Sequence, residues 1–100
     1  PDLREVADPQ SYEALVYEPP RASGALPLLL YLHGAGEMSG SLRDILSEGA
    51  TGTPPVELSR GTAIRELSER FVVVAPHTTK GWNPSLVGKF VDFLLEQSGL

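Results

Sequence analysis

The chain has 100 residues, of which 41% are hydrophobic and 21% are charged, a composition typical of one small globular domain. Its formal net charge of −5 argues against nucleic acids and anionic membranes as partners, because both attract basic surfaces. The absence of cysteine excludes disulfides, thiolate metal ligands and cysteine nucleophiles. No apolar run approaches the roughly 18 residues that a membrane-spanning helix needs.

The first part of the chain predicts two strands with a loop between them. Residues 1–10 are polar and show no period, so we expect neither a strand nor a helix there. Loose alternation over 12–18 predicts a strand near a sheet edge, and the proline and glycine cluster over 19–24 predicts a loop. The almost continuous apolar run over 28–33 predicts a strand buried on both faces, as found in parallel sheets.

The middle of the chain predicts two short helices and a further strand. A serine cap followed by leucine and isoleucine at helical spacing predicts a helix over 42–48. Glycines and prolines over 49–61 predict a long irregular connection, and a weak apolar face predicts a helix over 62–69. The uncharged, β-branched run over 71–75 predicts a second buried strand that stops at Pro76.

The last element is predicted to be an amphipathic helix over 84–98, which begins at an Asn83-Pro84 cap and stops at Gly99. Two buried strands joined by a helical crossover predict a parallel pair with a right-handed connection. The predicted fold class is therefore α/β. We expect one domain over 1–100 in three layers, with a mainly parallel sheet between flanking helices.

The candidate site follows the first buried strand, where His33 precedes Gly34, Ala35 and Gly36. Glycine lacks a Cβ, so the backbone can turn sharply and come close to another group. Backbone N–H groups exposed at the end of a strand are suited to stabilising developing negative charge. The pattern therefore predicts an anion-stabilising loop at this end of the sheet.

Four landmarks along the chain together resemble the α/β-hydrolase fold, and more narrowly its polyhydroxybutyrate-depolymerase-like and predicted-peptidase esterases. They cover about three-quarters of the chain and are, in order, Pro27 to Glu37, Gly52-Thr53-Pro54-Pro55, Val74-Ala75-Pro76 and Gly81-Trp82. The resemblance implies that Ala35, with Gly36 beside it, supplies backbone N–H groups to an oxyanion hole. It implies a second donor from the residue after the nucleophile, in a G-x-S-x-G turn.

That nucleophile turn is absent, because none of the serines has glycine at both the second position before and the second position after it. Ser39 comes nearest, in Gly36-Glu37-Met38-Ser39-Gly40, but its spacing is wrong. By the resemblance, the strand leading to the nucleophile would start at Leu100. We therefore expect the amino-terminal portion of a serine carboxylic-ester hydrolase, truncated before the nucleophile elbow and not catalytically competent alone, with no cofactor.

The remaining candidate residues surround this loop. His33 is interpreted as a structural histidine that hydrogen-bonds the neighbouring loop, and Glu37 as a carboxylate that accepts backbone N–H groups. His77 is interpreted as a surface loop residue, with substrate contact as the alternative, and Trp82 either lines a pocket or covers the start of the last helix. Two histidines without a clustered third ligand predict no metal site.

Other functions stay open at this stage. Gly34 and Gly36 begin a partial dinucleotide-binding pattern, but Ser39 stands where its third glycine belongs. A hydrolase scaffold that stops early leaves a strand edge unpaired, which favours a non-catalytic binding subunit completed by a protein partner or by a missing carboxyl-terminal segment. Exchange of elements between two copies is a third possibility. The start at Pro1 allows a removed leader and does not indicate a compartment.

Overall fold

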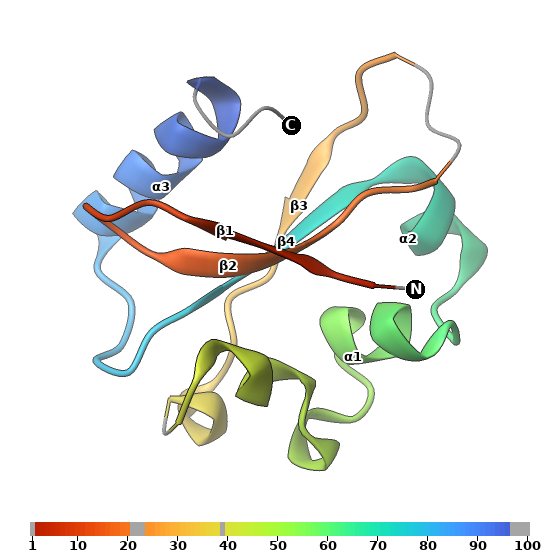
Figure 1. The fold of residues 1–100 in the computed structure, drawn as a ribbon, viewed down its shortest axis with the longest axis horizontal. Coiled ribbons are helices and arrows are strands. Elements are labelled where there is room, and N and C mark those ends of the chain that lie inside the picture. The colour runs from red at the N-terminus through yellow and green to blue at the C-terminus, as the bar shows by residue number, and fades with distance from the viewer. Residues whose placement is uncertain (1, 21–23, 39, 97–100) are drawn as a thin grey trace.

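A computed structural model describes residues 2–20, 24–38 and 40–96, with only the backbone of Glu37 described (Figure 1). Its centre is a four-stranded sheet in the order β1-β2-β4-β3. The strands are β1 (Arg4–Ala7), β2 (Glu13–Tyr17), β3 (Leu28–Leu30) and β4 (Val72–His77).

The sheet is mixed, which corrects the prediction of a mainly parallel sheet. The predicted parallel pair is present, because Leu28–Leu30 of β3 runs alongside Val72, Val73 and Val74 of β4 in the same direction. The other two pairings, β1 with β2 and β2 with β4, are antiparallel. β2 inserts between β1 and β4, so it is an interior strand, and four of its five residues are buried. The prediction that residues 12–18 lie near an edge is therefore wrong.

β1 was not predicted, because the sequence over 1–10 shows no apolar alternation. Its residues are mostly exposed, and the strand forms by hairpin pairing with β2 rather than by burial. The hairpin turn has Asp8 and Pro9 at positions that favour a type I turn. The Asp8 carboxylate accepts hydrogen bonds from the Gln10 N–H and the Ser11 hydroxyl, and the Ser11 N–H donates to the Asp8 carbonyl over 3.0 Å.

Pro76 ends the β3 ladder early, but the prediction that the strand over 71–75 stops at Pro76 is wrong, because β4 runs on to His77. The Val72 and Tyr31 N–H groups donate across the parallel pair, to the carbonyls of Pro27 and Val74. In this register the next donor on β4 would be residue 76, which as proline has no N–H, so the β3 ladder ends. β4 itself continues through Pro76 to His77, because its pairing with β2 uses the opposite edge of the strand.

The helices follow the predictions unevenly. In place of the helix predicted over 42–48 the structure has two short 3₁₀ turns, η2 (Leu42–Leu46) and η3 (Glu48–Ala50). The helix predicted over 62–69 is α2 (Arg65–Arg70), which begins three residues later. Helix α1 (Pro54–Arg60) lies within the predicted irregular connection. Its two prolines occupy the first helical turn, where a missing N–H does no harm, and Gly61 ends it with a positive φ of 76°.

Helix α3 (Pro84–Glu96) confirms the predicted last helix over its described length, and residues 97–99 lie outside the described residues. The Asn83 side-chain oxygen caps it by accepting hydrogen bonds from the Ser85 and Leu86 N–H groups. Phe90 and Leu94 are buried, whereas Leu95 is 68% exposed.

Helices cover both faces of the sheet (Figure 1). On one face α3 packs through Phe90 and Leu94 against Ala14, Val16 and Val74. On the other face the core is formed by the 3₁₀ and α1 residues and by side chains of β2 and β4, namely Leu42, Ile45, Leu58, Leu15, Tyr17, Val73 and Ala75. Within the described residues, no helix is long and apolar enough to cross a bilayer.

Candidate functional site

The candidate site lies where the parallel strands β3 and β4 end. Carboxyl ends of neighbouring parallel strands meet at one edge of a sheet, which is where open α/β sheets bind ligands. β3 leads into His33 and the short 3₁₀ turn η1 (Ala35–Glu37). β4 ends at His77 and leads into the loop over 78–83. The parallel register therefore brings the two segments that carry the predicted site residues to the same end of the fold.

His33 connects the two segments. It is only 3% exposed, its Nδ1 lies 2.7 Å from the Gly34 carbonyl oxygen, and its Nε2 lies 3.1 Å from the Thr78 backbone nitrogen. A carbonyl can only accept and an N–H can only donate, so His33 is neutral with the proton on Nδ1. Both ring nitrogens bond to backbone, which suits a loop-organising histidine and leaves no nitrogen directed at a substrate.

Trp82 holds the same loop from the other side. Its indole Nε1–H donates to the His33 carbonyl over 3.0 Å, and its ring centroid lies 4.9 Å from that of His33. The indole also meets Tyr12 in an edge-on contact, with ring centroids 5.2 Å apart. The Tyr12 hydroxyl in turn accepts the Asn83 N–H, next to the start of α3. Trp82 therefore supports the loop after β3 and also packs beside the helix start.

Ala35 and Gly36 form the exposed tip of this supported loop. In η1 the Met38 N–H donates to the Ala35 carbonyl over 3.2 Å. Within the described part of the chain, no acceptor is assigned to the N–H groups of Ala35 and Gly36, as expected at the start of a helical turn. Gly36 does not have a left-handed φ, and a Cβ built on it would meet nothing within 4 Å. No other part of the described chain therefore lies against Gly36 on the side where a Cβ would stand, although the sequence predicts a close contact there.

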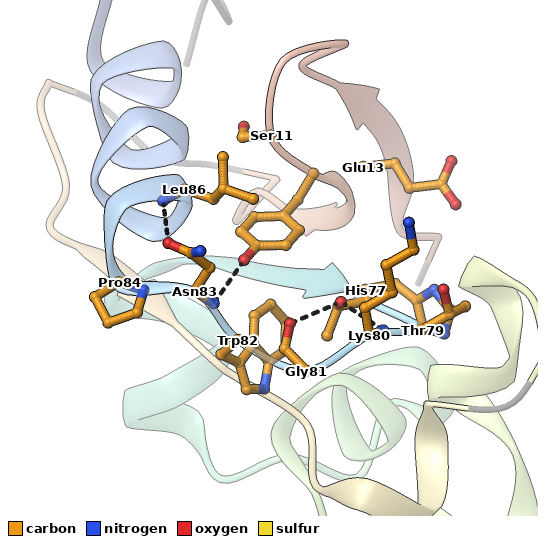
Figure 2. Close-up of a pocket in the computed structure, with 12 residues that line it drawn as sticks. Ser11, Glu13, His77, Thr79, Lys80, Gly81, Trp82, Asn83, Pro84 and Leu86 are labelled. Carbon is orange, nitrogen blue, oxygen red and sulfur yellow. Dashed lines mark hydrogen bonds between the residues drawn. The ribbon is translucent and has the colours of Figure 1, made fainter.

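A pocket of about 690 Å³ lies between the start of β2 and the segment around the end of β4 (Figure 2), and the residues that line it come from these two segments and not from the loop after β3. Tyr12, Trp82 and Leu86 supply apolar walls, and Glu13 and Lys80 are exposed charged groups in its lining. The complete lining is Ser11, Tyr12, Glu13, His77, Thr78, Thr79, Lys80, Gly81, Trp82, Asn83, Pro84 and Leu86.

His77 is the last residue of β4 and only 6% exposed, so the interpretation of His77 as a surface loop residue is wrong. Its ring centroid lies 5.2 Å from that of His33, and both His77 and Trp82 line the pocket. The loop that follows is fixed by Thr78, whose hydroxyl donates to the Gly81 carbonyl over 3.0 Å and accepts the Lys80 N–H over 3.1 Å.

The structure thus gathers His33, His77 and Trp82 into one cluster and places Gly34, Ala35 and Gly36 on the loop that the cluster supports. The proposed role of the Glu37 side chain falls outside the described residues, as does Ser39. Tyr12 and Thr78 also form part of this cluster and were not predicted. Neither stands at a spacing from His33 or Trp82 that a sequence motif would indicate. Across the described ranges there is no group of three or more histidine, aspartate or glutamate residues able to hold a metal ion.

No protein-family model, no curated protein and no solved structure matches this chain significantly.

Proposed function

We propose that residues 1–100 are the amino-terminal part of a serine carboxylic-ester hydrolase and supply its oxyanion-hole loop. In this proposal the backbone N–H groups of Ala35 and Gly36 donate to the oxyanion of the tetrahedral intermediate. The nucleophile, the acid and the base come from residues outside this chain, since none of its serines lies in a G-x-S-x-G sequence.

The observation that carries the proposal is the way the loop after β3 is held. Three hydrogen bonds hold this loop. The His33 ring bonds to the Gly34 carbonyl, the Thr78 N–H donates to the His33 ring, and the Trp82 indole N–H donates to the His33 carbonyl. The tip of the loop is exposed, and within the described residues no acceptor is assigned to the N–H groups of Ala35 and Gly36. Donors that are fixed before the reaction stabilise developing charge without any cost of reorientation, which is how oxyanion holes accelerate acyl transfer.

The parallel β3–β4 pair adds support, because it places this loop at the sheet end where ligands bind in α/β folds. A nucleophile on a further strand beside β3 would emerge at the same end. Its attack on an ester carbonyl would then develop negative charge in front of Ala35. The role of His33 in this arrangement is to position the loop, because both its nitrogens are already bonded to backbone.

The first test compares the 100-residue chain with the product of its gene extended past residue 100. We expect the chain alone to hydrolyse p-nitrophenyl acetate no faster than buffer and to resist labelling by a fluorophosphonate. The extended product should be labelled at a serine in a G-x-S-x-G sequence. Hydrolysis by the chain alone that disappears when one of its own serines is changed to alanine would contradict the proposal.

The second test addresses the oxyanion loop in the labelled, active protein. Ala35→Pro removes one N–H at the first position of a helical turn, where proline is tolerated. We expect kcat to fall roughly 100- to 1,000-fold with KM little changed. Ala35→Ser keeps the N–H and is the matched control, which should stay within a few-fold of wild type. Equal effects of the two variants would remove Ala35 from the oxyanion hole.

A second function, a non-catalytic binding subunit, is favoured by the outer edge of β3. β3 is the last strand in the described sheet, and Leu32 beside it is 40% exposed. A gene that encodes no nucleophile beyond residue 100, together with a stable one-to-one complex of this chain with another protein, would favour the subunit over the hydrolase.

A further inference from the structure

The pocket between the start of β2 and the end of β4 has two chemically different sides. Tyr12, Trp82 and Leu86 give it an apolar side, and Figure 2 shows the charged Glu13 and Lys80 on the opposite side from Leu86. Tyr12 and Glu13 are neighbours in extended chain, so their side chains point to opposite faces of the sheet. A volume of about 690 Å³ falls within the range of small-molecule sites. The two sides favour an amphipathic small molecule with a charged head.

Glu13 and Lys80 are opposite charges that the fold leaves unpaired. Both are exposed, and among the described residues neither side chain has an assigned hydrogen bond or ion pair, with the other or with any third group. Elsewhere on the described surface opposite charges do pair, as Arg4 does with Glu18 at 2.8 Å. An ammonium and a carboxylate in one pocket are complementary to a ligand that carries both groups. The lining therefore fits a zwitterion.

Tyr12 adds a buried hydrogen-bond donor to the pocket wall. The residue is 7% exposed, and its hydroxyl oxygen accepts the Asn83 N–H over 3.1 Å. Within the described chain no acceptor is assigned to the proton of this hydroxyl. A hydroxyl can accept and donate at once, and buried donors ordinarily have an acceptor. A ligand that brings an acceptor group would complete the bonding of Tyr12.

The pocket walls are held in place before any ligand binds. The Thr78 hydroxyl accepts the Lys80 N–H over 3.1 Å and donates to the Gly81 carbonyl over 3.0 Å, which fixes the turn that carries Lys80. The Trp82 indole N–H donates to the His33 carbonyl over 3.0 Å. Walls that are already ordered lose little conformational entropy on binding. These hydrogen bonds therefore favour a preformed site.

We propose that this pocket binds a free α-amino acid with an aromatic side chain. The ligand carboxylate pairs with the Lys80 ammonium and accepts the Tyr12 hydroxyl proton, and the ligand ammonium pairs with the Glu13 carboxylate. The ligand ring packs against Trp82 and Leu86, where contacts between aromatic rings add to the burial of apolar surface. A residue within a peptide lacks both charges, so the free amino acid is the better complement of this lining.

This site is separate from the proposed oxyanion loop, because residues 34–36 contribute nothing to its lining. The inference therefore does not rest on ester hydrolysis. Failure of the hydrolase tests leaves the binding tests unchanged, and a pocket that binds no amino acid leaves the tests for a serine nucleophile unchanged.

The primary experiment titrates the 100-residue chain with L-phenylalanine. Trp82 is the only tryptophan of the chain, so its fluorescence reports on the pocket directly. We expect a saturable change with a Kd on the order of 1 mM, as the usual binding free energy per atom gives for a ligand of this size. N-Acetyl-L-phenylalanine lacks the ammonium and L-phenylalaninamide lacks the carboxylate, so each should bind roughly three- to tenfold more weakly. The absence of a saturable response to L-phenylalanine, or equal affinity for all these ligands, would overturn the proposal.

Matched variants then assign the two charges. Glu13→Gln should weaken L-phenylalanine binding roughly three- to tenfold without weakening that of N-acetyl-L-phenylalanine. Lys80→Gln should weaken L-phenylalanine binding to the same extent without weakening that of L-phenylalaninamide. Both changes lie at exposed side chains with no assigned bonds among the described residues, so folding is retained.

Glu66→Gln and Lys89→Gln are the controls, because these exposed charges lie outside the pocket lining. Each should change the Kd for L-phenylalanine by less than about twofold. If Glu13→Gln and Lys80→Gln both keep the wild-type preference for L-phenylalanine over its two analogues, the ligand sits elsewhere and the proposal is overturned.

Discussion

The two edges of the sheet are built in opposite ways. β1 is charged and exposed, and its side chains form ion pairs, Arg4 with Glu18 at 2.8 Å and Glu5 with Arg43 at 3.1 Å. β3 is an uncharged run of leucines whose side chains are half-buried. Charged side chains discourage an edge from pairing with another chain, and apolar edges lack that protection. Among the described strands, one edge of the sheet therefore carries charges that discourage further pairing and the other does not.

The two edges also differ in how the fold supports them. β1 is held mainly by its hairpin with β2 and contributes only Val6 to the apolar cluster that contains Phe90 and Leu94. β3 pairs with β4 and contributes Leu28 and Leu30 to the same cluster. An edge held by side-chain packing is sensitive to core mutations, and an edge held by a hairpin is sensitive to its turn. The predictions below use this difference.

The largest effect is expected beneath β3. Phe90 is fully buried, so Phe90→Ala removes its packing against β3 and β4 and leaves a cavity, destabilising the protein by about 3–5 kcal/mol. Leu95→Ala, on the same helix but exposed, should change stability by no more than about 0.5 kcal/mol. Urea unfolding followed by circular dichroism measures both. A Phe90→Ala cost near that of Leu95→Ala would mean that the cluster under α3 does not support the β3 edge.

The β3 edge was easier to predict from the sequence than the β1 edge. The runs over 28–33 and 71–75 are uncharged and rich in leucine and valine, so burial alone indicated two neighbouring parallel strands. β1 has no such pattern, since it is held mainly by its ladder with β2 and only Val6 of its four residues is partly buried. The direction of β2 was beyond prediction as well, because it depends on which strand β2 joins and not on its own residues.

The candidate site was predictable in its residue types but not in its contacts. The strand end and the glycines indicate an exposed loop after His33. Pro54 and Pro55 favour a loop in the sequence, although prolines in the first turn of a helix, as in α1, are compatible with it. The hydrogen bond from Trp82 to His33 joins residues 49 positions apart. No local spacing rule covers such a contact, so the support of the loop was visible only in three dimensions.

The second prediction concerns the carboxyl end of β3. Trp82→Phe keeps an aromatic ring against Tyr12 and His33 but removes the indole N–H that bonds the His33 carbonyl. We expect a loss of about 1–3 kcal/mol, because the carbonyl loses its partner in a largely buried place. Amide exchange of Met38, whose N–H donates to the Ala35 carbonyl, and of Thr78, whose N–H donates to His33, should accelerate, whereas exchange in β1 should not change. Equal acceleration at both edges would indicate global loosening and not a local support.

The third prediction concerns the sheet interior between the edges. The Tyr17 hydroxyl donates to the Ser68 carbonyl over 2.7 Å, and burial, with a smaller contribution from the Glu69 charge, raises the pKa of Tyr17 above its ordinary value of 10.0. The unfolded chain therefore loses this proton first as the pH rises, so the contribution of Tyr17 to stability is constant below its ordinary pKa of 10.0 and falls above it.

Tyr17→Phe separates that contribution from other alkaline titrations. At neutral pH the variant should be less stable by about 0.5–1.5 kcal/mol, because the Ser68 carbonyl loses its partner. The difference between wild type and variant should shrink as the pH rises above 10.0, as measured by urea unfolding over a pH series. A difference that stays constant through this range would contradict the raised pKa of Tyr17.

The smallest effect is expected at the β1 edge. Arg4 and Glu18 are about half exposed, with side-chain exposures of 49% and 44%, so solvent and salt screen their attraction. A double-mutant cycle of Arg4→Met and Glu18→Gln should give a coupling energy of no more than about 0.5 kcal/mol, and added salt should abolish it.

A low coupling energy means that the charges of β1 add little to the stability of the monomer. Their main contribution is then to keep other strands from pairing with this edge, and the Arg4→Met/Glu18→Gln protein should self-associate more strongly than wild type at equal stability. Unchanged association of the double variant would instead assign the resistance of this edge to pairing to the shape of the short β1 strand.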